Sequence, residues 1–217
     1  MIKRQTAFVL LVLLLAASAC GTEDWHERLV YTGPIEIGIE SGSFLAGTDI
    51  QYLGETDQGA QVIIGGQQAT KRIGDSLEWA GEMVPGVMVN LSLRIVFVTQ
   101  DTLQTAGTVR VTVEGAEPVV EDIDMSAVVH YVLPVVYRVE RGAAIPGTTI
   151  TYEGQEDEGA RLGSIEGYAY RRVGDSILWQ GRLLPGVWLD LTLRTALITE
   201  GQLDVVGTAD VWIRPQG

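Results

Sequence analysis

Six polar side chains suited to acid–base or ionic chemistry recur in the chain at a spacing of one hundred residues. A pair of carboxylates such as Glu40 and Asp57 could divide the acid and base roles of a glycoside hydrolase. The other interpretation is cross-strand ion pairing with Arg72 and Arg94, which contributes only about 0.2–1 kcal/mol per pair on a sheet face. Two active sites in one small chain would be unusual, so ion pairing is favoured. The recurring residues are Glu40 and Glu140, Asp57 and Asp157, Arg72 and Arg172, Asp75 and Asp175, Arg94 and Arg194, and Thr99 and Thr199.

Other catalytic or metal-binding patterns are weak in this sequence. The two histidines, His26 and His130, lie far apart, and an imidazole-ligated metal site needs at least two that converge. The acidic stretches Glu55–Gly59 and Gln155–Gly159 carry carboxylates suitable for Ca²⁺ but lack the alternating aspartates of an EF-hand loop, so solvated turns are favoured. The sequence has no nucleophile elbow, phosphate loop or His-Glu-x-x-His motif. We therefore expect no catalytic residues, no metal, no cofactor and no enzyme activity.

The spacing of these residues reflects an internal duplication. Residues Leu29 to Glu117 align without a gap with Val129 to Gly217, and about 30 of the roughly 89 pairs are identical. The shared residues are mostly Gly, Pro, Trp and aliphatic side chains, which shape a fold. Each copy carries a complete set of strands and turns, so we expect each to fold alone, the alternative being that the copies complete one shared fold.

Alternation with a period of two dominates both copies. From Val87 to Phe97 every second residue is apolar, and the second copy repeats the pattern from Val187 to Leu197, which predicts a long half-buried antiparallel strand. Gly74-Asp75 and Pro85-Gly86 have the composition of tight turns. Seven short strands in each copy, with no helical period, predict an all-β protein of two tandem antiparallel β-sandwich domains, or alternatively two small barrels.

The amino-terminal residues predict export. Lys3 and Arg4 precede an apolar run, Ala7 to Ala17, that is shorter than the about 20 residues needed to span a bilayer. The run ends in Ala17-Ser18-Ala19-Cys20, which resembles the lipobox of bacterial lipoproteins. That resemblance implies cleavage before Cys20 and a diacylglycerol on its sulfur, hence anchoring in a bacterial cell membrane or envelope with the domains on the extracytoplasmic side. The alternative is an ordinary secretory signal cut near Ala19.

The two copies also resemble a known family of surface modules. Pro146-Gly-Thr-Thr-Ile-Thr-Tyr, Trp179-Gln-Gly-Arg-Leu-Leu-Pro-Gly-Val and the closing Gly207-Thr are similar to the Ig-like repeats of bacterial surface proteins. The resemblance implies a structural or adhesive role and brings no catalytic residues with it. The expected organisation is a signal peptide (1–19), a tether (20–28), a first repeat (29–115), an acidic linker (116–127) and a second repeat (128–217).

The charge of the chain excludes one class of partner. Removal of the signal peptide takes away Lys3 and Arg4 and no acid, which changes the formal net charge from −13 to −15. Such a surface repels nucleic acid and anionic lipid headgroups, so nucleic-acid binding is excluded. Cys20 is the sole cysteine, so the exported part has no internal disulfide and depends on its packed core.

Four aromatic residues distinguish the second copy from the first. They replace Gln68, Thr70, Met88 and Thr112, and alternation places Trp188 and Trp212 on the face opposite Val187 and Val211. We expect an aromatic patch on the outer face of the second repeat that docks onto the first repeat or binds a partner. The residues are Tyr168, Tyr170, Trp188 and Trp212.

Three functions follow from these features. The favoured one is a non-catalytic, membrane-anchored lipoprotein that acts as an adhesion, spacer or interaction module for an envelope or extracellular protein. The alternative is a glycan- or small-ligand-binding lipoprotein that uses the aromatic face of the second repeat. A hydrolase or inhibitor has the least support, because the sequence shows no converging polar residues.

Overall fold

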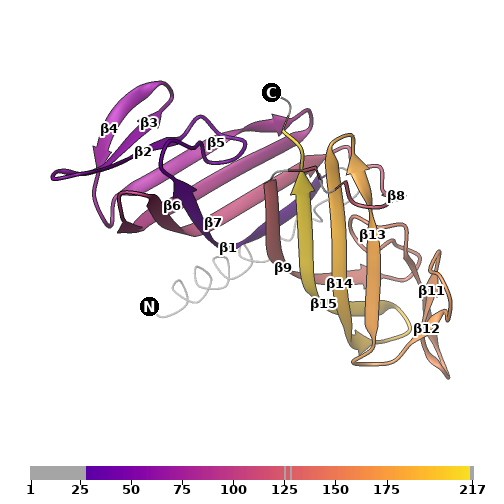
Figure 1. Cartoon of the computed structure of the whole chain (residues 1–217). Coiled ribbons are helices and arrows are strands. Elements are labelled where there is room, and N and C mark those ends of the chain that lie inside the picture. Colours follow the sequence, from indigo (N-terminus) through magenta and orange to yellow (C-terminus); the bar gives the residue numbers. More distant parts are fainter. Residues whose placement is uncertain (1–27, 125, 128, 216–217) are drawn as a thin grey trace, which may run out of the picture.

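The computed structural model describes residues 28–124, 126–127 and 129–215 and shows an all-β protein whose strands all pair antiparallel (Figure 1). The predicted signal peptide, Cys20 and the tether up to residue 27 lie outside these residues. The first repeat holds β1 (Arg28–Glu40), β2 (Gln51–Thr56), β3 (Gly59–Ile64), β4 (Gln67–Lys71), β5 (Ser76–Val84), β6 (Val87–Val98) and β7 (Thr102–Glu114). The rest holds β8 (Val119–Val120), β9 (Val129–Glu140), β10 (Thr151–Glu156), β11 (Gly159–Gly163), β12 (Tyr170–Arg171), β13 (Ser176–Leu184), β14 (Val187–Ile198) and β15 (Gln202–Ile213).

Each repeat contains one large and one small sheet. The large sheets have the orders β1-β7-β6-β5 and β8-β13-β14-β15-β9, and the small ones are β2-β3-β4 and β10-β11-β12. The predicted alternation is visible in β6, where the odd-numbered residues from Val87 to Ile95 are buried and the residues between them are exposed. None of these sheets is closed on itself, so the sandwich interpretation holds and the small barrels are not found.

The turns predicted from glycine have the expected conformations. Gly74 and Gly86 adopt φ values of 91° and 82°, which side chains with a Cβ rarely adopt. The carboxylate of Asp75 accepts a hydrogen bond of 2.8 Å from the backbone N–H of Arg72, closing the turn before β5. These turns set the lengths of β5 and β6 and therefore the register of the large sheet.

Each small sheet covers one end of its own large sheet. Tyr52 on β2 is fully buried, and its hydroxyl donates to the backbone carbonyl of Thr99, beyond the end of β6. Ile39 and Leu103, at the same end of β1 and β7, are buried too. The equivalent hydroxyl of Tyr152 donates to Thr199 in the second repeat. The small sheet thus protects half of an apolar face that runs the full length of the long strands.

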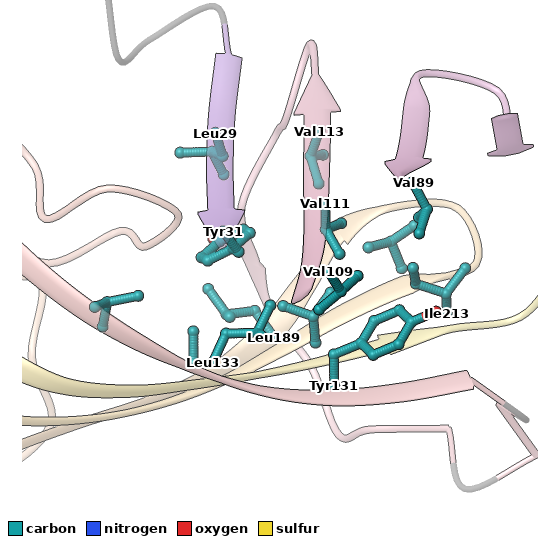
Figure 2. Packing of buried hydrophobic residues seen from close by; sticks show 14 of the residues in the cluster. Leu29, Tyr31, Val89, Val109, Val111, Val113, Tyr131, Leu133, Leu189 and Ile213 are labelled. Carbon is teal, nitrogen blue, oxygen red and sulfur yellow. The ribbon is translucent and has the colours of Figure 1, made fainter. Parts of the chain in front are cut away.

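The other half of that face is covered by the other repeat. Figure 2 shows residues of β1, β6 and β7 meeting residues of β9, β14 and β15 between the two large sheets. The contacts are reciprocal: a Cβ on Gly86 would lie 3.4 Å from Leu184, and a Cβ on Gly186 would lie 3.7 Å from Val84. Because the contacts repeat under exchange of the copies, the repeats are arranged like the halves of a two-fold dimer.

One hydrophobic core therefore runs through both repeats, which differs from the expectation of two self-sufficient domains. Leu29, Tyr31 and Val111 of the first repeat belong to the same buried cluster as Leu133 and Leu189 of the second. Alternation in the sequence showed that one face of each sheet is buried but carried no information about what covers it. In the structure the two copies pack their large sheets against each other around this one core.

The acidic segment between the repeats is part of the second large sheet. Val119 and Val120 form β8, which pairs with Gly181 and Arg182 of β13. The backbone N–H of Glu117 donates to the carbonyl of Leu183 at 2.9 Å. The expected linker is thus an additional edge strand and not a free connection.

Candidate functional site

Three of the six pairs of polar residues shared by both copies hold turns through their side chains: Asp75 and Asp175, Arg94 and Arg194, and Thr99 and Thr199. Arg94 Nη1 donates to the carbonyl of Gly74 at 2.9 Å, and Arg194 donates to Gly174 at 3.0 Å. Thr99 Oγ1 accepts from the backbone N–H of Thr102 at 2.9 Å. Within the described ranges no ion pair joins Glu40 or Asp57 to Arg72 or Arg94, so the expected cross-strand pairing is wrong. Arg94 and Arg194 have backbone carbonyls as partners, which explains the recurrence of this pair without a catalytic role.

The acidic loops form tight hairpins between β2 and β3 and between β10 and β11. In the second repeat, Arg161 lies 3.0 Å from Glu156 and 2.8 Å from Glu153. The hydrogen bond from Arg161, with a second from Tyr170, lowers the pKa of the Glu156 carboxyl. In the part of the chain that the structure describes, no three His, Cys, Asp or Glu side chains are grouped so as to hold a metal ion.

The four aromatic residues of the second repeat lie in two separate pairs. Tyr168 and Tyr170 belong to the small-sheet region, with ring centroids 5.5 Å apart, and Tyr168 is 65% exposed. Trp188 and Trp212 are directly opposite each other in β14 and β15 of the large sheet. The single aromatic patch expected from the sequence is therefore divided between two sheets.

Trp188 is covered by the segment between the repeats. It lies on the outer face, yet it is only 4% exposed. Its indole Nε1 donates to Glu121 at 3.4 Å, and the guanidinium of Arg214 lies 5.2 Å from its ring centroid. Arg182 donates to Glu121 at 2.7 Å, and this hydrogen bond is the main cause of the lowered pKa of that carboxyl. Trp188 thus anchors the connecting segment and is not part of an open binding surface.

Trp212 stacks against His130, which no sequence motif marks as part of a site. The ring of His130 lies 3.7 Å from that of Trp212 with an interplanar angle of 9°. His130 Nε2 donates to Asp210 at 2.8 Å, and Asp190 lies opposite Asp210 in the ladder. Burial, followed by the charge of Asp210, raises the pKa of Asp190. Because His130 covers a face of the Trp212 ring, that face is closed to stacking with a sugar.

A signal for this cluster exists in the comparison of the two copies. The first copy has Val30, Asn90 and Arg110 where the second has His130, Asp190 and Asp210. All three changes fall on one outer face next to Trp212, which replaces Thr112. Together with the aromatic replacements, these three changes mark His130 in the sequence.

A groove lies where the edge strands of the two large sheets approach each other. It has a volume of about 510 Å³, within the range of about 300–1,000 Å³ typical of ligand pockets. Its floor is apolar, with Tyr131 and Leu45 buried and Ile37 half-buried. Glu36 and His130 supply its charged and polar groups.

The strands beside the groove have backbone groups that face away from their own sheets. Ser41 donates its N–H to Asp101 at 2.7 Å and continues the register of β1 with β7. Because hydrogen-bonded and non-bonded pairs alternate in an antiparallel ladder, the even-numbered residues of β1 turn their N–H and C=O groups to the free edge. Arg141 and Gly201 give the same result for β9. Glu36, Gly38, His130 and Val132 therefore present backbone donors and acceptors to the groove.

Searches of protein-family models, of curated proteins and of solved structures found no match to this chain. No helix among the described residues is long and apolar enough to cross a membrane. The chain is thus defined by its architecture, two large antiparallel sheets from duplicated repeats that share one core.

Proposed function

We propose that this protein is a non-catalytic envelope lipoprotein that presents a paired-sheet surface to a protein partner, as an adhesion, spacer or interaction module. The observation that supports this proposal most strongly is that two of the six polar pairs shared by both copies hold the backbone of turns. Asp75 and Arg94, with Asp175 and Arg194, bond to the backbone of their own turns at 2.7–3.0 Å. Side chains committed to holding turns are not available for acid–base work.

Anchoring through Cys20 complements this role. The resemblance of residues 17–20 to a lipobox implies a diacylglycerol on the cysteine, and two acyl chains give stable attachment where a single chain gives only marginal binding. The first described residue, Arg28, already starts β1, so only a short tether separates the lipid from the sheets. The module would then stay close to its membrane, on the extracytoplasmic side.

The glycan-binding alternative depends on a different pair of rings. Tyr168 is 65% exposed and tilted at 54° to Tyr170, so these rings offer an accessible aromatic surface. The tryptophans contribute little to it, because Trp188 is covered and Trp212 is stacked against His130. Mutation of Tyr168 to Ala would abolish binding to glycan-coated surfaces under this alternative and would leave a protein interaction elsewhere unchanged.

Site-specific crosslinking in the cell tests the proposed function. The photoreactive residue p-benzoylphenylalanine is placed singly at four exposed positions on different surfaces, Gln58, Met88, Val132 and Tyr168. A discrete adduct with another envelope protein at one or two positions, and none at the others, is expected. Equal labelling at all four positions, or no adduct at any of them, would contradict an interaction module.

A further inference from the structure

The duplication provides an internal control for the groove, because the equivalent junction on the other side of the molecule is filled. The groove is lined by Ile37 and Tyr131. In the equivalent junction Tyr137 stands in place of Ile37, and Tyr31 stands in place of Tyr131. Tyr137 is 9% exposed and Tyr31 is 1% exposed, whereas Ile37 is only half-buried. Burial, with a smaller effect from Tyr137, raises the pKa of Tyr31, so these two rings lie close together in the filled junction.

The loop that follows each edge strand shows the same asymmetry. Gly147 is buried, and a Cβ on it would lie 2.8 Å from the Tyr31 hydroxyl. Thr148 is 5% exposed, while its counterpart Thr48 is half-buried. Ala46, which lines the groove, stands where the second copy has Pro146. The open junction thus has Ile37 where the closed one has the buried ring of Tyr137, and Ala46 where the closed one has Pro146.

We propose that the groove between β1 and β9 binds an extended segment of a partner protein, which adds to the free edge of β1 and inserts an aromatic side chain beside Ile37 and Tyr131. This inference rests on the proposed function and specifies the chemistry of the partner. Backbone groups of Glu36 and Gly38 face the free edge and pair with the added strand, as in other cases of strand addition. The aromatic side chain takes the place that Tyr137 occupies in the closed junction.

The charge of the protein specifies the flanks of the segment. Side chains of adjacent residues in a strand point to opposite faces, so the neighbours of an inserted aromatic residue lie on the outer face. Glu36 is exposed on that face, where the second copy has Val136. With a formal net charge of −13 on the whole chain, the protein favours basic residues at those two positions. The partner segment is therefore aromatic in the centre and basic on either side.

The proline at the centre of each edge strand limits what can pair there. Pro34 and Pro134 occupy equivalent positions on the free edges and have no N–H to offer. Pairing along the whole of β1 is thereby interrupted, which discourages edge-to-edge association of two copies. The part of β1 beyond Pro34 keeps its donors and lies in the groove.

A peptide of defined sequence tests this proposal on the mature chain carrying Cys20→Ser. The probe is capped, fluorescein-labelled Val-Lys-Tyr-Lys-Val, followed by fluorescence anisotropy, and its controls replace the tyrosine by alanine or both lysines by glutamates. We expect the alanine peptide to bind at least about tenfold more weakly, because its side chain does not fill the space beside Ile37 and Tyr131. Equal binding of the tyrosine and alanine peptides would overturn the aromatic assignment.

Substitutions copied from the closed junction locate the binding site. Ile37→Tyr fills the groove with the side chain of the second copy, and should weaken peptide binding at least about tenfold while the thermal midpoint stays the same or rises. Met88→Tyr adds the same ring on the outer face and should leave binding unchanged. Glu36→Val should weaken binding of the lysine peptide and strengthen that of the glutamate peptide. Unchanged binding to the Ile37→Tyr variant would overturn the proposal.

The same measurements separate the other possible occupants. If p-cresol binds as tightly as the peptide, the occupant of the groove is a small molecule and not a partner segment. If light scattering shows a dimer that Ile37→Tyr converts to a monomer, the occupant is a second copy of the protein. Failure of the peptide together with cellular adducts at Met88 or Tyr168 would overturn the groove assignment alone. Peptide binding without any cellular adduct would instead contradict the proposed interaction function.

Discussion

Separation of the two repeats should unfold both, because each repeat buries half of the inner face of the other. The perturbation is separate expression of two fragments, residues 20–117 with Cys20→Ser and residues 118–217. The division before residue 118 keeps β8 in the fragment that contains the rest of its sheet. The first repeat would then expose seven side chains that are at most 5% exposed in the whole protein. They are Leu29, Tyr31, Val87, Val89, Val109, Val111 and Val113.

The size of the effect follows from these side chains. Exposing a fully buried Val or Leu side chain costs about 1.5–3 kcal/mol, so full exposure of all seven costs on the order of 10 kcal/mol. This value is an upper estimate, since each fragment relaxes around the lost contacts. It is still comparable with the whole stability of a typical domain, about 5–15 kcal/mol. Neither fragment should therefore remain a folded monomer.

Circular dichroism and light scattering provide the assay. Each fragment alone should lack a cooperative thermal transition or should self-associate, and an equimolar mixture should recover the β spectrum and the transition of the intact chain. The matched control is the intact protein cleaved after folding at a protease site inserted at Gly115, which should keep its structure. Cooperative unfolding of both fragments as monomers would refute the reasoning and restore two independent domains.

Three further outcomes are expected. Cys20→Ser should move the protein from the membrane fraction to the soluble one or leave it uncleaved, and a soluble wild type with another mature end would contradict lipidation. Gly207→Ala should destabilise by more than about 3 kcal/mol in urea unfolding, because its Cβ would lie 2.0 Å from a backbone carbonyl, whereas Gly201→Ala, with nothing within 4 Å, should be neutral. The raised pKa of Asp190 means that the folded state binds its proton more tightly than the unfolded state, so its contribution to stability is lost as pH rises through the folded pKa. Asp190→Asn should therefore raise the thermal midpoint at pH 7 and lose this advantage well below pH 3.8, the ordinary value of the group, and an equal gain at both pH values would contradict it.

The elements of the fold were accessible from the sequence because their causes are local. Alternation from Val87 to Ile95 reports one buried face, but the predicted burial of Phe97 is wrong, because a bulge between Ile95 and Phe97 turns that side chain outward. Gly74-Asp75 reports a turn whose φ and side-chain bond need those two residues. What covers a buried face is not a local property. Tyr31 alternates in the same way whether it meets a small sheet or the other repeat, so the shared core was not predictable from period alone.

The candidate site was only partly accessible for the same reason. Alternation places Trp188 on the outer face, but the residues that cover it, Glu121 and Arg214, lie far from it in sequence. No sequence motif marks the groove, because it lies where Ile37 replaces the aromatic residue of the second copy, Tyr137. It becomes visible only when Ile37 is compared with Tyr137 in the presence of the fold.

The arrangement of the copies explains how such a site could arise without loss of stability. In a symmetric pair of identical repeats, any change at the junction occurs twice, so opening one groove opens both. Once the copies are joined in one chain, Tyr137 can close one junction and keep the core covered while Ile37 leaves the other open. The reverse substitution, Tyr137→Ile, should therefore cost stability, about 1–3 kcal/mol from lost burial, whereas Ile37→Tyr should cost none. Equal destabilisation by both changes in urea unfolding would mean that the two junctions are equally packed and that the open groove is not a site.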